Sequence, residues 1–207
     1  KGGIFDHVGF GFYRYSVDAK WLVPHFEKML YDNALLGIAY TMAYEKTKKP
    51  LYKEITEKIF EFVIRDLTSE EGGFYSALDA ETEGEEGKFY LFTKDEIIEL
   101  LGEEYGEFYC NYYGIREEGN FESKNIPNLI DKDLNNINDV DKAKLESIRD
   151  RVFHHRDKRT KPHRDEKILT SWNGLMIASL AYGGKVFGNE TYINNAKRAA
   201  DFIIMNS

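Results

Sequence analysis

Two histidines in this chain occupy corresponding places in two similar stretches. His25 and His163 each follow a proline, and each is followed by a Glu-Lys pair, by two aliphatic residues and then by an asparagine, Asn33 or Asn173. Two imidazoles on opposite sides of a sugar carbon can remove and return a proton, which is the step that an epimerase requires. The alternative for each histidine is a structural role, in which the ring bonds to a backbone carbonyl or to the helix that follows.

Carboxylates offer a second chemistry. A glycosidase uses two of them, one as the acid and the other as the base or nucleophile. Asp32, Asp79 and Asp165 are the candidates, but a sequence alone does not give the distances between them. Glycoside hydrolysis therefore stands as the alternative to proton transfer by histidines.

Polar and aromatic residues gather around both Pro-His stretches and in two glycine-rich segments. Carboxylates and amides can hold sugar hydroxyls, and aromatic rings stack on the face of a sugar. The predicted catalytic residues are His25, His163 and Asp79. The predicted ligand-binding residues are Tyr13, Tyr15, Glu27, Tyr31, Asp32, Tyr75, Arg164, Asp165, Lys167, Trp172 and Asn173.

A repeated helical hairpin must position these residues. Residues 34–42 are nearly all apolar or small, which predicts a helix buried on most sides, with Asp32 or Asn33 as its N-cap. A one-sided amphipathic helix follows Pro50, and the same contrast returns in residues 175–182 and 192–204, 140 residues later. Such spacing indicates a repeat architecture. The alternative is a plain helical bundle in which the match is accidental.

The segments between the two hairpins predict smaller elements. Residues 73–78 and 88–93 are predicted to pair as a β-hairpin around an acidic turn. That turn resembles the start of a calcium-binding EF-hand loop, but Tyr90 stands where the twelfth-position glutamate is needed, so an EF-hand is rejected. A looser calcium site is the weaker alternative to a solvated turn.

Further helices are predicted after this hairpin. Thr93 to Glu96 form a capping box that starts a short helix, and residues 105–113 and 141–155 predict two more. Residues 114–139 are expected to be irregular. The basic run 156–161 is predicted to be a solvated loop or, alternatively, a rim that attracts anions.

Bulk composition excludes several classes of function. The 207 residues carry a net charge of −8, which argues against nucleic acid as a partner. Cys110 is alone, so no disulfide and no cysteine-based zinc site can form within one chain. No apolar run is long enough to span a membrane and no signal peptide is visible, so we expect a soluble, cytoplasmic protein. We expect no metal and no cofactor, and both ends of the chain look cut from a longer protein.

Several long strings resemble one family. They are residues Gly9–Asp18, Trp21–Asn33, Glu71–Ala80, Gly84–Tyr90, Lys161–Thr170 and Trp172–Leu175. The chain resembles the middle part of the thioredoxin-domain-containing proteins that include spermatogenesis-associated protein 20 and its bacterial relatives. The resemblance implies a thioredoxin-like domain outside this chain, and places this region in an (α/α)6 toroid similar to six-hairpin glycosidases and N-acylglucosamine 2-epimerases. It implies a fold more firmly than a reaction.

The expected fold is therefore mainly α: part of an (α/α)6 toroid with a small β-hairpin insertion. Residues 1–66 would hold a leading loop and the first hairpin, residues 67–139 the insertion, and residues 140–207 further helices with the second hairpin. In a toroid the two Pro-His segments would share one rim and line a pocket for a sugar or polyol. A third hypothesis is a non-catalytic module that binds a polyol, a peptide or its own thioredoxin-like domain. That hypothesis expects Glu27, Lys28, Glu166 and Lys167 to be buried and paired.

Overall fold

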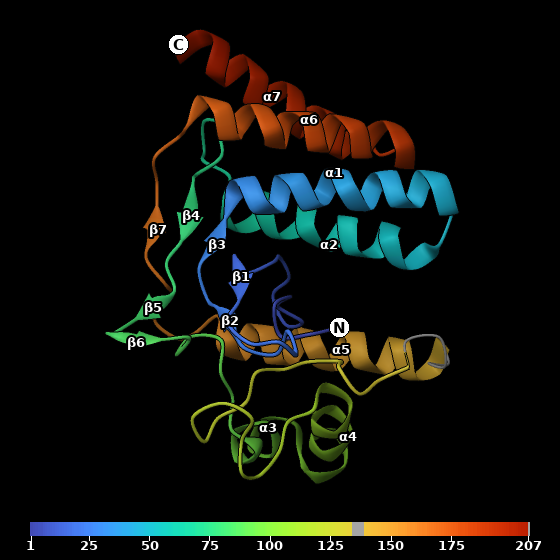
Figure 1. Ribbon diagram of the computed structural model, residues 1–207, viewed down its shortest axis with the longest axis vertical. Helices are drawn as coiled ribbons and strands as arrows, with labels where there is room; N and C mark the ends of the chain where they lie inside the picture. The colour runs from blue at the N-terminus through green and yellow to red at the C-terminus, as the bar shows by residue number, and fades with distance from the viewer. Residues whose placement is uncertain (134–138, 207) are drawn as a thin grey trace. The chain divides into compact units, whose positions relative to one another are not determined.

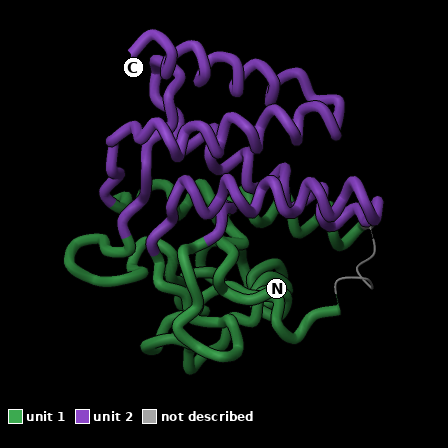
Figure 2. Tube along the Cα trace, turned by 45° about the horizontal axis from the view of Figure 1, so that its top comes forward, with its two compact units in different colours: residues 1–9, 13–26, 80–162 green, residues 10–12, 27–79, 163–207 purple. Residues whose placement is uncertain are grey.

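Short strands and long helices make up the chain, and the helices dominate. The computed structural model describes residues 1–133 and 139–206. Figure 2 shows the two compact units into which the chain divides. Unit 1 consists of residues 1–9, 13–26 and 80–162, and unit 2 of residues 10–12, 27–79 and 163–207. The division of the chain into segments 1–66, 67–139 and 140–207 stays a prediction.

Unit 2 contains the repeated hairpin that the sequence predicts. Helices α1 (Leu30–Thr47) and α2 (Pro50–Asp66) form the first copy, and α6 (Thr170–Phe187) and α7 (Glu190–Asn206) form the second. Every helix of the second copy begins and ends 140 residues after its counterpart, so the repeat is confirmed. Figure 1 shows that α1 and α6 start at the same end of unit 2 and run in the same direction.

Small residues let α1 and α6 approach each other closely. A Cβ atom added to Gly37 would lie 2.4 Å from Ser179 Oγ, and one added to Gly183 would lie 2.4 Å from the ring of Phe60 on α2. The prediction that the first helix is buried on most sides is wrong for this chain. Leu35 and Met42 are half exposed, because α1 packs against α2 and α6 and leaves its remaining face open.

A three-stranded sheet precedes these helices and sets where α1 begins. Strands β3 (Lys28–Met29), β4 (Ala77–Leu78) and β7 (Arg164–Asp165) pair in the order β3-β4-β7. The N–H of Leu30 donates to the Ser76 carbonyl at 2.9 Å, so the first helical amide already has a partner. The predicted N-caps, Asp32 and Asn33, are therefore wrong: the helix starts earlier, with Met29 in the N-cap position.

Asn33 ties a loop to the first turn of α1. Its Oδ1 accepts the N–H of Phe12 at 2.8 Å, and its Nδ2 donates to the Phe12 carbonyl at 3.1 Å and to the Met29 carbonyl at 3.0 Å. The side chain is fully buried. One amide group thus satisfies both polar groups of a loop residue and one carbonyl at the helix start.

Asn173 makes the same three bonds in the second copy. Its Oδ1 accepts the N–H of Phe74 at 2.8 Å, and its Nδ2 donates to the carbonyls of Phe74 at 2.9 Å and Leu169 at 3.1 Å. We call each of these arrangements an asparagine clasp. The two clasps show that the copies share side-chain chemistry as well as helix length.

A glycine before each clasped phenylalanine completes the arrangement. A Cβ atom on Gly11 would lie 2.4 Å from the ring of Phe62, and one on Gly73 would lie 2.7 Å from the ring of Phe202. Phe62 and Phe202 are themselves equivalent, on α2 and α7. Gly11 also has φ +77°, which disfavours a side chain there. Each loop therefore packs on the outer helix of its own hairpin and bonds to the inner helix.

Unit 1 holds three helices and two pairs of short strands among the residues that the structure describes. Helix α3 (Lys94–Leu101) begins at the predicted capping box, where Thr93 Oγ1 accepts the N–H of Glu96 at 3.1 Å. Helices α4 (Glu103–Tyr113) and α5 (Asp139–Arg156) follow. A core that includes Val8, Tyr109 and Val152 joins them. Residues 114–133 contain neither helix nor strand, as predicted; residues 134–138 of that segment lie outside the described residues.

The predicted hairpin of residues 73–78 and 88–93 is wrong. In unit 1 the strands that pair are β1 (Tyr15–Ser16) with β2 (Pro24–His25), and β5 (Glu81–Thr82) with β6 (Glu85–Glu86). Residues 88–93 form no strand because the guanidinium of Arg159 takes the carbonyls of Phe89 at 2.8 Å and Leu91 at 2.7 Å. Those carbonyls would otherwise accept ladder bonds.

Replacing either clasp asparagine should destabilise the protein. Asn33→Ala and Asn173→Ala each leave a buried N–H and buried carbonyls without partners, so we expect each to lower the free energy of unfolding by about 2–4 kcal/mol. Asn→Asp at either site should be as costly, because a carboxylate cannot donate to a carbonyl. Urea unfolding measures the loss. Asn195→Ala, at an exposed amide that bonds Thr191 on α7, is the control and should change stability by less than about 0.5 kcal/mol. A loss at one clasp only would contradict their equivalence.

Candidate functional site

His25 pairs with a carboxylate in unit 1. It lies on β2 opposite Tyr15 of β1, and the two rings stack with centroids 5.1 Å apart. Its Nδ1 is 2.8 Å from Glu86 Oε1, on β6. Glu86 Oε1 also accepts the N–H of Phe26 at 3.4 Å, so the carboxylate fixes the backbone beside the histidine. A carboxylate bonded to one ring nitrogen fixes the orientation of an imidazole.

His163 stands beside carboxylates in unit 2. Strands β4 and β7 pair Ala77 with Asp165, and the N–H of Asp79 donates to the His163 carbonyl at 2.8 Å, which continues the same register. Residues opposite each other share a face of the sheet, and alternate residues return to it. Asp79, His163 and Asp165 therefore lie on one face, with facing Cβ atoms about 5 Å apart and diagonal ones about 7–8 Å apart.

The two Pro-His histidines differ in their contacts. The ring of His25 bonds the Glu86 carboxylate, whereas the bond between His163 and Asp79 joins backbone groups and sets the two residues opposite each other. Sequence reasoning identified both histidines and Asp79 but missed Glu86, which stands in an acidic turn with no motif to distinguish it. The prediction that the two histidines line one pocket concerns both units and stays a prediction.

Aromatic side chains lie at the starts of α1 and α6. Tyr31 and Trp172, both half-buried, meet edge to face with centroids 4.8 Å apart. The guanidinium of Arg164 lies 4.3 Å from the ring centroid of Tyr75, which also belongs to unit 2. These four predicted ligand-binding residues thus form two contacts within unit 2, one between two aromatic rings and one between a guanidinium and a ring.

Charged residues near β7 form ion pairs with one another. Lys167 Nζ lies 3.0 Å from Asp165 Oδ2, and this hydrogen bond lowers the pKa of Asp165. Arg164 donates to Glu166 Oε1 at 2.7 Å and to the Asp66 carbonyl at 3.3 Å. Asp165 is therefore ionised at neutral pH, as a base or a hydroxyl acceptor must be.

Other predicted site residues lie deeper. Tyr13 is 3% exposed, packs edge to face on Phe26 and Tyr90, and has its pKa raised well above the usual value by burial. Asn173 has no exposed surface and forms a clasp, so it would influence a ligand through the position of Phe74. Glu27 and Asp32 are half-buried at the start of the first hairpin.

The pairing that the non-catalytic hypothesis expects is only partly present. Lys28 is 1% exposed, and its Nζ donates to the Phe10 carbonyl at 2.7 Å and lies 4.6 Å from the Phe62 ring centroid. Glu166 and Lys167 are exposed. Lys28 therefore serves the fold of the first copy, whereas Lys167, which follows Glu166 as Lys28 follows Glu27 in the sequence motif, stays at the surface.

The basic run 156–161 contains a buried ion pair that the sequence did not reveal. Arg156 and Asp6 are each 3% exposed, and the guanidinium nitrogens reach both Asp6 carboxylate oxygens at 2.9 Å. A Cβ atom on Gly9 would lie 2.0 Å from Arg156 Nη2. Burial alone would lower the pKa of Arg156, but the Asp6 carboxylate raises it above its usual value. A solvated loop or an anion-binding rim is therefore wrong for Arg156, because its anion is Asp6.

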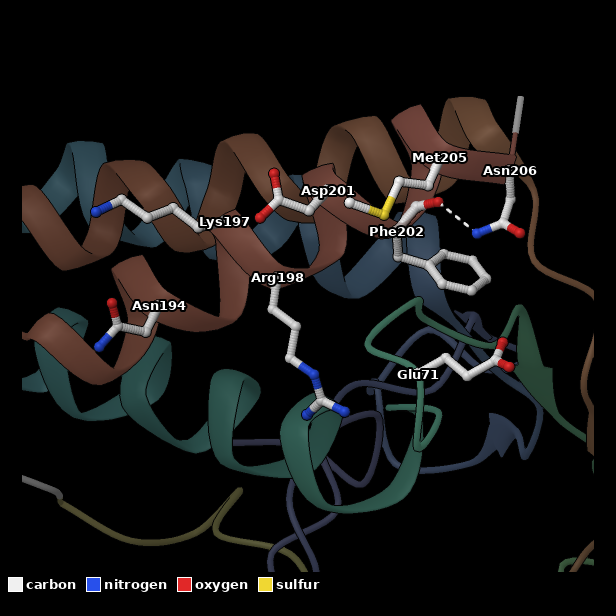
Figure 3. Close-up of a pocket in the computed structure, with 8 residues that line it drawn as sticks. All are labelled: Glu71, Asn194, Lys197, Arg198, Asp201, Phe202, Met205 and Asn206. Atoms are coloured by element: carbon white, nitrogen blue, oxygen red, sulfur yellow. Dashed lines mark hydrogen bonds between the residues drawn. The ribbon is translucent and has the colours of Figure 1, made fainter.

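A shallow hollow of about 550 Å³ runs along α7 in unit 2. Figure 3 shows Lys197, Arg198 and Asp201 on its helical wall, with Glu71 across from them. Arg198 also donates to the Glu70 carbonyl. None of these residues was predicted as a ligand contact, and acids and bases are mixed along the wall.

Among the described residues, no helix combines the length and apolar character needed to cross a membrane. Burial, followed by the charge of Glu107, raises the pKa of Cys110 to about 12. This thiol is therefore protonated at neutral pH, where a redox cysteine would be a thiolate.

Several curated mammalian proteins similar to this chain share one name. No established family profile matches it. Human spermatogenesis-associated protein 20 is 37% identical over 98% of this chain, and the mouse protein of that name is 35% identical over the same share. An uncharacterised protein of Caenorhabditis elegans is 30% identical over 98%. The chain spans about 30% of the length of the human protein.

One solved structure also resembles the chain. The crystal structure of D-mannose isomerase aligns with 96% of this chain and 47% of its own, with 15% sequence identity and a TM-score of 0.34. So low a score carries no argument about fold or activity.

Replacing either partner of the buried ion pair between Asp6 and Arg156 should destabilise unit 1. We expect Arg156→Met and Asp6→Asn each to lower the free energy of unfolding by about 3–5 kcal/mol, because each leaves a buried charge or donor fork unpaired. The double variant should recover part of the loss. Urea unfolding measures this, with Arg116→Met, in an exposed pair 3.7 Å from Asp131, as a control that changes stability by less than about 1 kcal/mol. Equal effects of Arg156→Met and the control would contradict the assignment.

Proposed function

This chain belongs to the family of spermatogenesis-associated protein 20, and from that premise we propose that it is part of an α/α toroid that binds and isomerises a sugar. The observation that supports the proposal most is the bond between the His25 ring and Glu86, together with the strand register that sets His163 opposite Asp79. Histidine beside a carboxylate is an arrangement suited to a general base. His25 with Glu86 and His163 with Asp79 are the proposed proton carriers.

The proposed chemistry is removal of a proton next to a carbonyl. The imidazole takes the proton from the carbon, the C–H electron pair moves into an enolate, and the same proton or one from solvent returns to either face of the carbon. No proton is gained or lost overall. Such positioned acid-base groups typically accelerate a reaction about 10²–10⁴-fold.

The ligand would be held by groups on unit 2 that suit hydroxyls and a sugar face. The contact between Tyr31 and Trp172 offers half-exposed aromatic surface at the helix starts. Asp165 is an ionised acceptor, and Arg164 and Lys167 are donors beside it. Aromatic surface flanked by fixed donors and acceptors is typical of carbohydrate sites.

Glycoside hydrolysis is the second candidate, and one observation favours it. Asp79 and Asp165 share a sheet face with a diagonal Cβ separation of about 7–8 Å. Catalytic carboxylates lie about 5–9.5 Å apart in glycosidases. Sugar epimerisation remains our first proposal, because histidines occupy both copies and Asp165 has no counterpart beside His25.

A non-catalytic module is the third candidate, and the clasps favour it. Asn33, Asn173 and Lys28 all belong to the repeated motif, and all act within the fold. In that case the motif would chiefly lock helix starts, and the ligand could be the thioredoxin-like domain of the longer protein. A cytoplasmic location is part of the same proposal.

Isotope exchange tests the histidines. The full-length protein is incubated in D₂O with a panel of aldoses and N-acyl hexosamines, and loss of the proton signal at the carbon next to the carbonyl is followed by NMR. We expect exchange with at least one sugar, and a loss of about 10²–10⁴-fold in His25→Asn and in His163→Asn. Glu86→Gln should lose less, because the amide still orients the ring.

The matched control is His154→Asn. His154 is exposed on α5 and bonds only the Asp150 carbonyl at 2.6 Å among the groups that the structure describes, so its variant should exchange normally. Exchange that survives both His25→Asn and His163→Asn would refute the proposed carriers. Release of free sugar from a panel of aryl glycosides, tested in parallel, without exchange in the free sugars would instead support hydrolysis, and its loss in Asp79→Asn would assign it.

A further inference from the structure

Helix α1 carries an apolar stripe on its exposed side. Leu35, Ala39 and Met42 recur at i, i+4 and i+7, which places them along one side of the helix. Leu35 is 49% exposed and Met42 is 50% exposed, and Ala39 is exposed as well. Residues 34–44 include no charged residue. A helix that is apolar all round is normally buried, so water is not the expected neighbour of this stripe.

The neighbouring helix α2 has the surface of a solvent-facing helix. Its exposed side carries ion pairs one turn apart, which join Lys53 to Glu57 at 3.7 Å and Arg65 to Glu61 at 3.6 Å. Such pairs are typical of a helix surface in water. The contrast marks α2 as the outer helix of the hairpin and α1 as an inner helix, whose free side is built for another protein surface.

The second copy shows what covers the counterpart of Ala39. At the constant offset of 140 residues, that counterpart is Ser179 on α6. Helices α1 and α6 pack side by side (Figure 1). Ser179 has no exposed surface, and a Cβ atom added to Gly37 of α1 would lie 2.4 Å from its Oγ. In the second copy, therefore, the inner helix of the other hairpin covers this position.

The counterpart of Met42 has the same neighbouring helix. It is Tyr182, which is half-buried and donates its hydroxyl to Glu45 Oε2 on α1 at 2.7 Å. The rings of Tyr44 and Phe187 meet with centroids 5.4 Å apart, so the contact reaches the last turn of α6. The two copies share helix lengths and the asparagine clasp. The stripe on α1 is thus the surface that one more inner helix would cover in the same way.

We propose that the stripe of Leu35, Ala39 and Met42 binds the inner helix of a further hairpin of the same repeat, supplied by a part of the longer protein outside these 207 residues. The surface continues the α1–α6 interface by one more copy, and its lack of charge suits an apolar helix. The human relative is long enough to contain further copies, since this chain spans about 30% of it. The inference rests on the toroid of the proposed function and on no part of the proposed reaction.

Site-specific cross-linking in the full-length protein identifies the occupant. Photoreactive p-benzoylphenylalanine replaces Met42, and mass spectrometry identifies the linked peptide after irradiation. We expect a link within one molecule, to a segment outside these 207 residues that has a charge-free run like residues 34–44. The same group in place of Glu57, on the solvent-facing side of α2, is the control and should form no such link. A link between two molecules, or to the thioredoxin-like domain, would overturn the proposal.

Oxidation of the native methionines tests the same surface without any substitution. Hydrogen peroxide converts methionine to its sulfoxide, and buried methionines react slowly. In the full-length protein, Met42 should react as slowly as Met176, which has no exposed surface. It should also react at least about tenfold more slowly than in the urea-unfolded protein. Peptide mass spectrometry measures both rates, and because no sugar is involved, the result is independent of the isotope exchange.

Two outcomes of the oxidation experiment would contradict the proposal. One is rapid oxidation of Met42 while Met176 stays protected, which would show that no element covers the stripe. The other is protection of Met42 that is lost on dilution, which would assign the surface to a second copy of the protein.

Discussion

The asparagine clasp is the interaction on which the repeated hairpin depends. A short amide side chain satisfies the N–H and the carbonyl of a loop phenylalanine and a carbonyl at the helix start, once with Asn33 and once with Asn173. Asparagine suits this position because it carries both a donor and an acceptor on one planar group. A loop without such a partner would bury unsatisfied backbone groups beside the helices.

The two copies differ in sequence around the clasp, and these differences determine which charged groups are buried and which lie at the surface. At the position of Lys28, whose ammonium is buried over Phe62, the second copy has Ile168, whose methyl group would meet a Cβ atom on Gly73 at 2.9 Å. A buried ammonium needs a fixed acceptor, which the Phe10 carbonyl supplies. The second copy has no such requirement, so Lys167 stays at the surface and pairs with Asp165. Related scaffolds thus carry different polar groups.

Helices were predictable here and short-range strand pairing was not. The helices followed from apolar periodicity and from the constant spacing between copies, both of which are local signals. The strands are two residues long, and which residues pair depends on tertiary bonds such as those that Arg159 makes to the Phe89 and Leu91 carbonyls. Arg156 resembled a surface residue because its partner, Asp6, lies at the other end of unit 1's sequence. The histidines could be chosen from the repeat, whereas Glu86 depends on a hairpin register that no periodicity indicates.

Native-state hydrogen exchange at two backbone amides tests the equivalence of the copies most directly. The N–H groups of Phe12 and Phe74 each donate to a buried asparagine at 2.8 Å. If the two clasps are equivalent, both amides should exchange slowly. Their protection should be similar to each other and to that of amides inside α1 and α6. Rapid exchange at either phenylalanine, with the helices still protected, would contradict the account.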